Sequence, residues 1–317
     1  MINFPTLTEV RKAAERIKPY AHRTPIFTCS SLNQMAQAQL FFKCENFQKV
    51  GAFKFRGACN AVLSLSENEA RRGVATHSSG NHAAALALAA RIRGIEAFIV
   101  MPKNAPEVKK AAVAGYGGKI VFCEPTLAAR EATLDKVIQE TGAVVVHPYN
   151  DHRVIAGQGT VALELLEEVP GLEAVMAPVG GGGLLSGTAI VVSELSSLTK
   201  VIAAEPEEAD DAYRSFREGR LIPAKPSSTI ADGLRTSLGD LTFPIIRKHV
   251  HDIVTVSEKA IVRAMRHVWE RMKIVIEPSA AVTLGALLEK RIDLTGKRIG
   301  LILSGGNVDL DRLPWMS

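Results

Sequence analysis

Lys54 is the residue whose surroundings most clearly favour chemistry. It stands between Phe53 and Phe55 and precedes an apolar, helix-like run, Ala58–Leu65. An ammonium group among apolar neighbours is costly unless it is paired or gives up its proton. A lysine in such a place has a lowered pKa and can act as an amine nucleophile, for instance in a Schiff base with an aldehyde cofactor. The alternative is a lysine that reaches solvent from the first turn of an amphipathic helix.

Four consecutive glycines that open a predicted helix form a second candidate site: Gly180, Gly181, Gly182 and Gly183. Glycines let the backbone come close to a ligand, and the N-terminus of a helix adds a partial positive charge. We therefore expect a phosphate here, although a flexible turn between strand and helix is the alternative. The spacing matches neither a P-loop nor a dinucleotide fingerprint.

Two shorter polar stretches also follow predicted strands. Ser78–His82 (SSGNH) begins a helix, either as a cluster of capping residues or as a set of donors for a carboxylate, with Asn81 beside a cofactor ring. Ser304–Asn307 (SGGN) follows the last strand. Its serine hydroxyl either hydrogen-bonds a heterocyclic nitrogen or closes the turn.

Acidic residues cluster in a third stretch, from Glu205 to Asp211, where five of seven residues are Asp or Glu. Acids in the first turn of a helix are stabilised by its dipole, which explains such a cluster without any ligand. The alternative is a site for a hard cation, built from carboxylates, a backbone carbonyl and waters.

The elements that position these residues alternate between short apolar runs and longer helical patterns. The predicted strands are Leu40–Cys44, Val74–His77, Ala97–Met101, Lys119–Cys123, Ala143–Val146, Glu173–Pro178, Val201–Ala204 and Arg298–Leu303. Alternation of this kind predicts an α/β fold with parallel sheets covered by helices on both faces. Each candidate site falls where a strand ends, at the edge where open α/β sheets bind ligands. Residues 217–252, rich in Pro and Gly, are expected to be connecting loops.

Composition excludes several other classes of protein. The 317 residues are 47% hydrophobic and 22% charged, and the net charge of +5 comes from scattered Lys and Arg without interleaved aromatics. Nucleic acid is therefore not an expected partner. The four cysteines form no CxxC spacing, and no signal peptide or membrane-length apolar run is evident. We expect a cytoplasmic protein without a membrane association.

Taken together, these motifs resemble the fold-type II pyridoxal-phosphate (PLP) enzymes, specifically the serine/threonine dehydratase and serine racemase family. The resemblance runs from about Thr24 to Trp315, and the lysine motif, SSGNH, the tetraglycine, EPEEADD and SGGN occur in the family order. The strings GAFK, HPYNDHRVIAGQGT and GGNVDLDRLPW are most similar to bacterial 3-hydroxyaspartate dehydratases within that family. The implied fold is tryptophan synthase β-like, with two open, twisted, mostly parallel sheets.

The resemblance also implies roles for individual residues. Lys54 forms the Schiff base with PLP, Phe53 packs on the ring, Asn81 contacts the 3-hydroxyl, the tetraglycine holds the phosphate, and Ser304 faces the pyridine nitrogen. Ser78, Ser79, Asn81 and His82 bind the substrate carboxylate, Ser79 being also the second acid/base of the racemases. Arg130 matches an arginine near a bound dicarboxylate in some relatives. Glu205, Asp211 and the carbonyl of Ala209 match a site for Mg²⁺, Ca²⁺ or Mn²⁺.

Two departures from the family pattern concern the cofactor's surroundings. Ala52 stands where many members have serine, and Tyr149 stands where many have a different residue close to the cofactor. The resemblance further implies a homodimer, with a large PLP-binding domain (residues 1–70 and 148–317) and a small mobile domain (residues 71–147).

The expected activity is that of an ammonia-lyase acting on a small-molecule amino acid. It eliminates water and then ammonia from a β-hydroxy amino acid to give a 2-oxo acid, with 3-hydroxyaspartate as the first candidate substrate and L-serine or L-threonine otherwise. One rival is an amino-acid racemase that exchanges protons between Lys54 and Ser79. A rival of another class is a non-catalytic amino-acid-binding protein that retained the fold.

Overall fold

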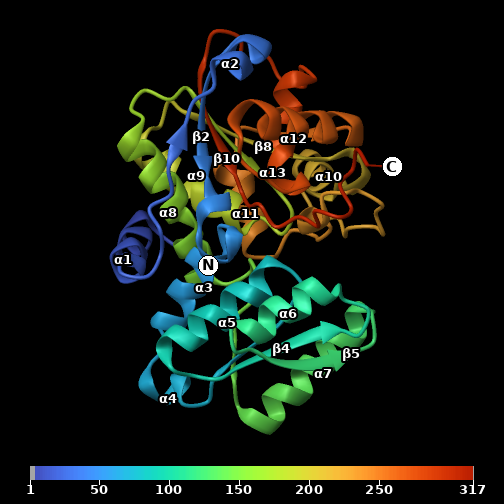
Figure 1. Ribbon diagram of the computed structural model, residues 1–317. Helices are drawn as coiled ribbons and strands as arrows, with labels where there is room; N and C mark the ends of the chain where they lie inside the picture. Colours follow the sequence, from blue (N-terminus) through green and yellow to red (C-terminus); the bar gives the residue numbers. More distant parts are fainter. Residues whose placement is uncertain (1–3, 317) are drawn as a thin grey trace.

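A computed structural model describes residues 4–316 and contains two α/β bodies, one above the other in Figure 1. The large body is built on a six-stranded sheet of order β1-β2-β10-β7-β8-β9, and the small body on a four-stranded sheet of order β5-β4-β3-β6. Every pairing is parallel except that of β1 with β2. The predicted α/β fold with two mostly parallel sheets is confirmed.

The strands agree closely with the apolar runs of the sequence. Those of the large sheet are β1 (Ile26–Phe27), β2 (Gln39–Cys44), β7 (Ala174–Pro178), β8 (Lys200–Pro206), β9 (Asp252–Val256) and β10 (Arg298–Leu303). Those of the small sheet are β3 (Val74–His77), β4 (Ala97–Pro102), β5 (Lys119–Cys123) and β6 (Val144–Val145).

Helices cover both faces of each sheet. In the large body they are α1 (Leu7–Ile17), α2 (Ser30–Ala36), α8 (His152–Glu168), α9 (Gly183–Leu195), α10 (Asp211–Glu218), α11 (Thr242–His249), α12 (Glu258–Met272) and α13 (Pro278–Leu288). In and beside the small body they are α3 (Lys54–Leu63), α4 (Glu67–Ala70), α5 (Asn81–Arg93), α6 (Glu107–Gly115) and α7 (Leu127–Thr141). Four short 3₁₀ turns are η1 (Glu45–Phe47), η2 (Lys49–Gly51), η3 (Glu207–Ala209) and η4 (Asp232–Leu234). No helix in residues 4–316 is long and apolar enough to cross a membrane.

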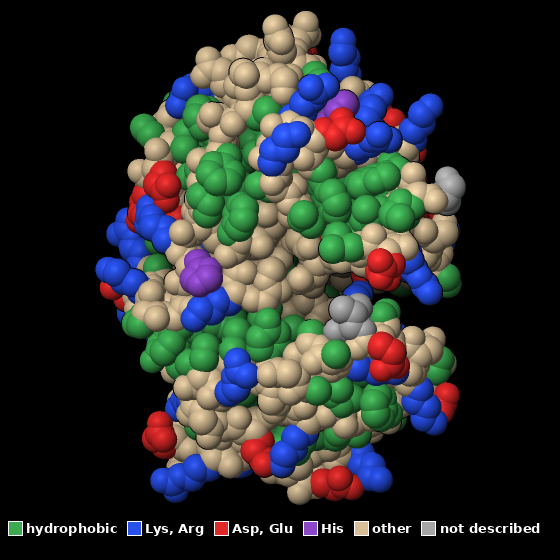
Figure 2. All heavy atoms as spheres, viewed as in Figure 1, with side chains coloured by type: hydrophobic (Ala, Val, Ile, Leu, Met, Phe, Trp, Pro, Cys, Tyr) green, Lys and Arg blue, Asp and Glu red, His purple; other side chains and the backbone are tan. Residues whose placement is uncertain are grey.

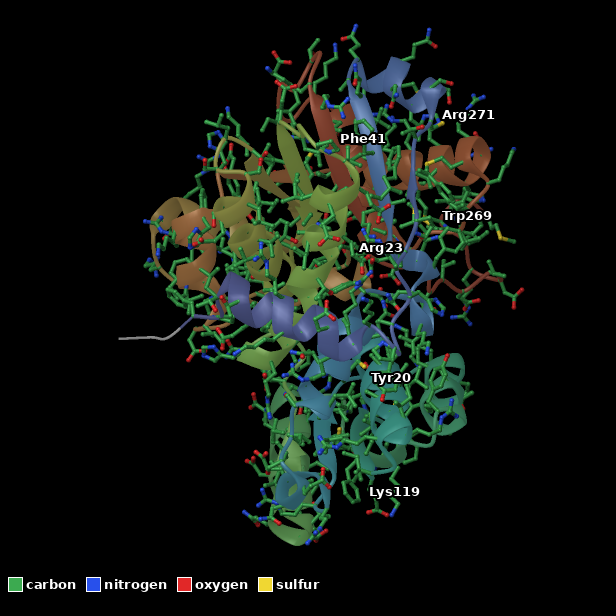
Figure 3. All side chains as sticks on the ribbon, turned by 90° about the vertical axis from the view of Figure 1, so that its left-hand side faces the viewer. Tyr20, Arg23, Phe41, Lys119, Trp269 and Arg271 are labelled. Carbon is green, nitrogen blue, oxygen red and sulfur yellow. The ribbon has the colours of Figure 1, made fainter. Side chains whose placement is uncertain are left out.

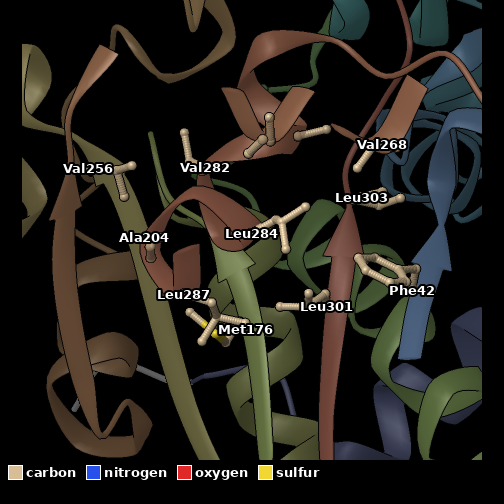
Figure 4. Packing of buried hydrophobic residues seen from close by; sticks show 14 of the residues in the cluster. Phe42, Met176, Ala204, Val256, Val268, Val282, Leu284, Leu287, Leu301 and Leu303 are labelled. Carbon is tan, nitrogen blue, oxygen red and sulfur yellow. The ribbon is translucent and has the colours of Figure 1, made fainter. Parts of the chain in front are cut away.

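The large sheet is buried on both faces, as expected for parallel strands that read as continuous apolar runs. On one face, α12 and α13 pack on side chains such as Phe42, Met176 and Leu301, with Leu284 and Leu287 projecting from α13 toward the sheet (Figure 4). On the other face lie α1, α8, α9 and α11. This sandwich fixes the carboxyl ends of the strands, where the candidate residues stand.

The two bodies meet along α3, the helix that begins at Lys54. It packs on α5 of the small body and on α8 of the large body. A Cβ atom on Gly157 would lie 2.6 Å from the Cα of Gly57, so glycines permit the close approach of α3 and α8. In Figure 3, Lys119 lies on the narrow small body and Phe41 and Arg271 on the wider large body, with Tyr20 near their junction.

The prediction of connecting loops in residues 217–252 is wrong in part. Within residues 217–252, α11 is a helix and η4 a 3₁₀ turn. Pro244 is the third residue of α11, where the backbone N–H has no partner in the helix, so proline is tolerated. Thr242 accepts a hydrogen bond from the N–H of Gly239 and donates one to the carbonyl of Gly181, so this segment supports the tetraglycine.

Candidate active site

The candidate residues of the large body come together because their strands are neighbours. Strand β10 lies between β2 and β7, so the turn at Ser304 stands between the lysine motif and the tetraglycine. The N–H of Phe53 donates to the carbonyl of Ser304 at 3.0 Å, and Ala52 pairs with Gly305 as an isolated antiparallel bridge. The lysine motif and SGGN are therefore joined directly.

Lys54 lies at the start of α3 in surroundings that favour the neutral amine. Its Nζ donates to the carbonyl of Pro148 at 2.9 Å and lies 5.1 Å from the centre of the Phe53 ring. Burial lowers the pKa of Lys54 to about 8, although the carboxylate of Glu277 opposes the shift. An amine with this pKa is an effective nucleophile near neutral pH.

The tetraglycine forms a cradle for an anion. In the part of the chain that the structure describes, the N–H groups of Gly180, Gly181 and Gly182 have no acceptor, and α9 begins at Gly183. Gly182 has a φ of 88°, and a Cβ on Gly181 would lie 2.2 Å from the Tyr149 ring. Free N–H groups at a helix N-terminus are suited to a phosphate.

A second cradle stands opposite, in the small body, at the start of α5. The N–H groups of Ser79, Asn81 and His82 have no acceptor within residues 4–316. Gly80 donates to the Ser78 hydroxyl at 3.4 Å. These donors suit a carboxylate, as the sequence predicts.

Asn81 also links the two bodies. Its Nδ2 donates to both carboxylate oxygens of Glu277, at 3.0 and 3.1 Å, and its Oδ1 accepts from Asn307 Nδ2 at 3.0 Å. The N–H of Asn307 reaches Glu277 as well, at 3.2 Å. Burial raises the pKa of Glu277 to about 7, although the Asn81 hydrogen bond opposes the shift. SSGNH and SGGN are thus brought together through a glutamate.

The ring of His82 faces away from the cradle. It is 2% exposed, and its Nε2 lies 3.0 Å from the carbonyl of Val146. Burial lowers the pKa of His82 to about 3, so the ring is neutral at physiological pH. The main-chain N–H of His82, and not its ring, is therefore available to a substrate carboxylate.

Three further predicted residues have polar groups that are available for a ligand. The hydroxyls of Ser79 and Ser304 have no hydrogen-bond partner among the described side chains and backbone. Arg130 lies on α7, and its buried Nε has no hydrogen-bond partner among the described residues.

The acidic stretch lies at the end of β8, on the other side of the tetraglycine strand. Glu205 Oε1 accepts from the N–H of Tyr213 at 3.0 Å, and the buried Asp211 Oδ2 has no partner among residues 4–316. Burial raises the pKa of Glu205 well above its ordinary value and that of Asp211 to about 7. Within the described residues no three His, Cys, Asp or Glu side chains are grouped as for a metal ion.

Glu277 is a site residue that the sequence analysis missed. It immediately precedes Pro278, the first residue of α13, and is the one acid in the run Ile274–Leu288. An acid that is buried usually has a partner. The isolated position of Glu277 in an apolar run was therefore the feature of the sequence that could have marked it as a site residue.

A comparison with protein families decides what kind of site this is. Residues 17–305 match the model of the family described as "Pyridoxal-phosphate dependent enzyme". The chain belongs to this family. The chemistry of a PLP enzyme agrees with the geometry, because it needs an amine for the aldehyde and a cradle for the phosphate.

Relatives of this PLP-dependent enzyme include dehydratases and racemases. A "beta-hydroxyaspartate dehydratase" of Paracoccus denitrificans is 56% identical over 98% of this chain and 99% of its own. The crystal structure of serine racemase from Dictyostelium discoideum has a TM-score of 0.93 and 49% identity, covering 96% of this chain and 99% of that chain. A pyridoxal 5'-phosphate-dependent aspartate racemase also has a TM-score of 0.93, with 40% identity and full coverage of both chains.

Proposed function

We propose that this PLP-dependent enzyme is an ammonia-lyase that converts 3-hydroxyaspartate to oxaloacetate and ammonia. The observation that carries the proposal is its 56% identity, over almost the whole chain, to a beta-hydroxyaspartate dehydratase. The free guanidinium of Arg130 supports a substrate with a second carboxylate. L-Serine and L-threonine are the next candidates.

The residues present fit PLP. The free N–H groups of Gly180, Gly181 and Gly182 suit its phosphate, and Lys54, which Phe53 flanks, suits its aldehyde. When bound, PLP withdraws electrons from the substrate's α-carbon. The Ser304 hydroxyl, a neutral group, is proposed to face the pyridine nitrogen, and Asn81 the 3-hydroxyl.

The protein's own groups then handle protons and water. We propose that Lys54 takes the α-proton, and that the N–H groups at Ser79, Asn81 and His82 hold the substrate's α-carboxylate, with the Ser78 hydroxyl beside them. Loss of the β-hydroxyl as water gives an enamine, which hydrolyses to the 2-oxo acid and ammonia. An amine whose pKa is about 8 is suited to exchanging this proton near neutral pH.

The test is the release of 2-oxo acid and ammonia by the purified protein with PLP and Mg²⁺. The substrates are the stereoisomers of 3-hydroxyaspartate, L-serine, D-serine and L-threonine. We expect the highest kcat/KM for one hydroxyaspartate isomer and no turnover by Lys54→Ala. After borohydride reduction, PLP should be found on the peptide that contains Lys54. A higher kcat/KM for serine or threonine would refute the proposed substrate.

Racemisation is a second candidate activity, favoured by the similarity to serine racemase and by the unpartnered Ser79 hydroxyl. A proton donor on the face opposite Lys54 would return the α-proton to the other side. Ser79→Ala is expected to abolish racemisation and to keep elimination from one enantiomer. Chiral chromatography of the unreacted amino acid measures this. Equal loss of both activities would argue against the role.

We also propose a metal ion, Mg²⁺, Ca²⁺ or Mn²⁺, at Glu205, Asp211 and the carbonyl of Ala209. The unpartnered Asp211 Oδ2 and the raised pKa of both buried acids support it, because a cation would compensate buried carboxylates. Chelator should lower the melting temperature and Mg²⁺ restore it, whereas Asp211→Asn should be insensitive to both. A melting temperature of the wild type that ignores chelator would contradict the site.

Three larger-scale properties remain proposals of the same kind. Residues 71–147 are proposed to move as a small domain over the rest of the chain. The four-stranded sheet, Val74–Val145, lies within this range, and Figure 2 shows the surface hollowed between the two bodies.

A homodimer is also proposed. The exposed, edge-to-face pair Phe27 and Phe47 supports it, and sedimentation velocity tests it. A cytoplasmic location stays a prediction of the sequence.

A further inference from the structure

The turn that leads into Lys54 has an unusual backbone. Val50 and Gly51 both adopt left-handed conformations, with φ values of 57° and 69°. Glycine takes this conformation at no steric cost, whereas a β-branched side chain rarely does, because its Cβ atom crowds the following carbonyl. Among residues 4–316, Val50 is the one β-branched residue with a positive φ. Other parts of the protein must therefore hold this turn in place.

The side chain of Asn307 holds the turn. Its Nδ2 donates a hydrogen bond of 2.7 Å to the carbonyl of Val50. Its amide group also lies against Gly51, where a Cβ atom would be 2.7 Å from Asn307 Oδ1. The N–H of Gly306 donates to the carbonyl of Gly51 at 2.9 Å. The segment after β10 thus fixes both left-handed residues, and Asn307 supplies the bond to Val50.

The same amide group reaches the small body. Asn307 Nδ2 also donates to Asn81 Oδ1, at 3.0 Å. An asparagine amide has two donor hydrogens, and here one serves each body. Glu277 orients both residues, because its carboxylate accepts from Asn81 Nδ2 and from the N–H of Asn307. Asn307 is therefore a direct connection between α5 and the turn before Lys54.

The turn is short, and its conformation determines where Lys54 stands. Ala52 and Phe53, which lie between Val50 and Lys54, are both tied to Ser304–Gly305, through the bridge at Ala52 and the 3.0 Å bond from the N–H of Phe53. The segment is therefore held at three points. Loss of the bond at Val50 would let this residue relax from its left-handed conformation and would pull on the two remaining ties and on Lys54.

We propose that Asn307 is a positioning residue that holds the Lys54 turn in its working conformation while α5 is docked on the large body. Movement of the small body away would take Asn81 from Asn307, leave the amide with one partner, and loosen the turn. The position of α5 is in this way transmitted to the amine. The inference rests on the proposed Schiff base at Lys54 and does not depend on which amino acid is the substrate.

The first test measures the rate of PLP capture by the apoenzyme in a stopped-flow instrument. Asn307→Leu keeps the size of the side chain and removes both donors, so capture should slow by roughly 3- to 10-fold, as for one lost uncharged hydrogen bond. Adding Val50→Gly should restore the rate to within about twofold, because glycine adopts the left-handed conformation without support. Val50→Ala, which keeps a Cβ atom, should restore much less.

Two further variants separate hydrogen bonding from bulk. Asn307→Asp has the shape of asparagine but no donor on its side chain, so it should slow capture as Asn307→Leu does. Asn46→Leu removes a bond to the carbonyl of Val275 from the preceding turn η1 and should leave the rate unchanged. A normal rate in Asn307→Leu, or equal rescue by Val50→Gly and Val50→Ala, would refute the positioning role. Borohydride reduction that labels a peptide without Lys54 would instead refute the proposed Schiff base.

Hydrogen exchange of the PLP-loaded enzyme tests the connection to the small body. Asn81→Leu should speed amide exchange in the peptide that contains Gly51 and Phe53, whose N–H groups are hydrogen-bonded. In a chain that already carries Asn307→Leu, the same substitution should add little, because both residues act through one contact. Fully additive effects, or exchange that ignores Asn81→Leu, would show that the turn does not sense the position of α5.

Discussion

At the scale of single residues, the acidity of Lys54 is the property with the most direct kinetic consequence. Burial lowers its pKa from 10.5 to about 8, so half of the amine is neutral near pH 8. Only the neutral amine attacks an aldehyde, so the rate of PLP capture by the apoenzyme should rise with pH through about 8 and then level off. Stopped-flow absorbance measures it, with Nα-acetyl-lysine as the reference amine. A rate that still climbs beyond pH ~9.5, as for an ordinary lysine, would contradict the shift.

The carboxylate of Glu277 contributes to the pKa of Lys54. Its negative charge raises the pKa of Lys54, in opposition to burial. Glu277→Gln keeps the shape and one acceptor oxygen for Asn81 but removes the charge, so the midpoint of PLP capture should move to lower pH. Glu173→Gln, an exposed carboxylate far along the chain, is the matched control. An unmoved midpoint in Glu277→Gln would show that the two groups do not interact.

Candidate site residues could be predicted from the sequence where their neighbours along the chain suggest a role. Lys54 stands between two phenylalanines, and the tetraglycine follows an apolar run, so local context was enough for a hypothesis. Glu277 depends on a partner far away in the sequence, Asn81, and nothing local indicates that pair. The orientation of the His82 ring toward the core is equally hidden from local sequence, because its partner, the carbonyl of Val146, lies 64 residues further along the chain.

At the scale of elements, a buried ionic network fixes the helix that carries Lys54. Arg56, in the first turn of α3, forms ion pairs with Glu45 at 2.7 Å and Glu164 at 2.6 Å, and Lys43 reaches Glu164 at 2.6 Å. Arg56, Lys43 and Glu45 are 0% exposed. Arg56 thereby joins α3 to η1, which carries Glu45, and to α8, which carries Glu164, and Lys43 adds β2 to the network.

Removal of Arg56 should destabilise the protein strongly. Arg56→Met leaves the buried Glu45 without a cationic partner and the half-buried Glu164 with Lys43 alone, which costs about 3–5 kcal/mol of unfolding free energy. Arg23→Met breaks the exposed pairs with Glu167 and Glu168 and should cost less than about 1 kcal/mol. Urea denaturation compares the two variants, and similar midpoints would refute the role of the network.

The tetraglycine turn should tolerate no side chain at its centre. A Cβ on Gly181 would lie 2.2 Å from the Tyr149 ring, so Gly181→Ala must displace either the ring or the turn. We expect PLP affinity to fall by roughly tenfold or more, as judged from overpacking costs of about 1–3 kcal/mol. Gly115→Ala, where no atom lies within 4 Å, should bind PLP normally. Equal affinity of the two variants would argue against this turn as the phosphate cradle.

Regular elements were predictable where one physical signal dominated. Strands buried on both faces read as apolar runs, and eight of the ten strands follow from this pattern. Strand β1 has only two residues, and β9 follows a segment rich in proline and glycine, so neither gives a pattern of its own. Helix α11 was missed because Pro244 suggests a loop, although proline is compatible with the first turn of a helix.

At the scale of the whole molecule, the site is shared between two bodies and is complete only when they meet. Lys54, the tetraglycine and Ser304 lie on the edge of the large body, whereas Ser78–His82 and Arg130 lie on the small one. The strand order brings each half to one sheet edge, but no local pattern fixes how the two edges face each other. We propose that the two bodies open to admit substrate and close to exclude water during the reaction.

An ion pair across the junction offers a test of this closure. Lys109, on α6 of the small body, lies 2.6 Å from Asp232, in η4 of the large body, and both side chains are partly exposed. Lys109→Gln or Asp232→Asn should weaken the closed state and raise KM by about two- to fivefold, because a partly exposed pair contributes ~1 kcal/mol or less. The double variant should add little to either single one, and the effect should shrink in high salt. Lys297→Gln removes a similar pair, with Glu173, within the large body and should leave KM as it is. If the effects of the two single variants are fully additive, the pair does not couple the bodies, and closure depends on the Asn81–Glu277 contact instead.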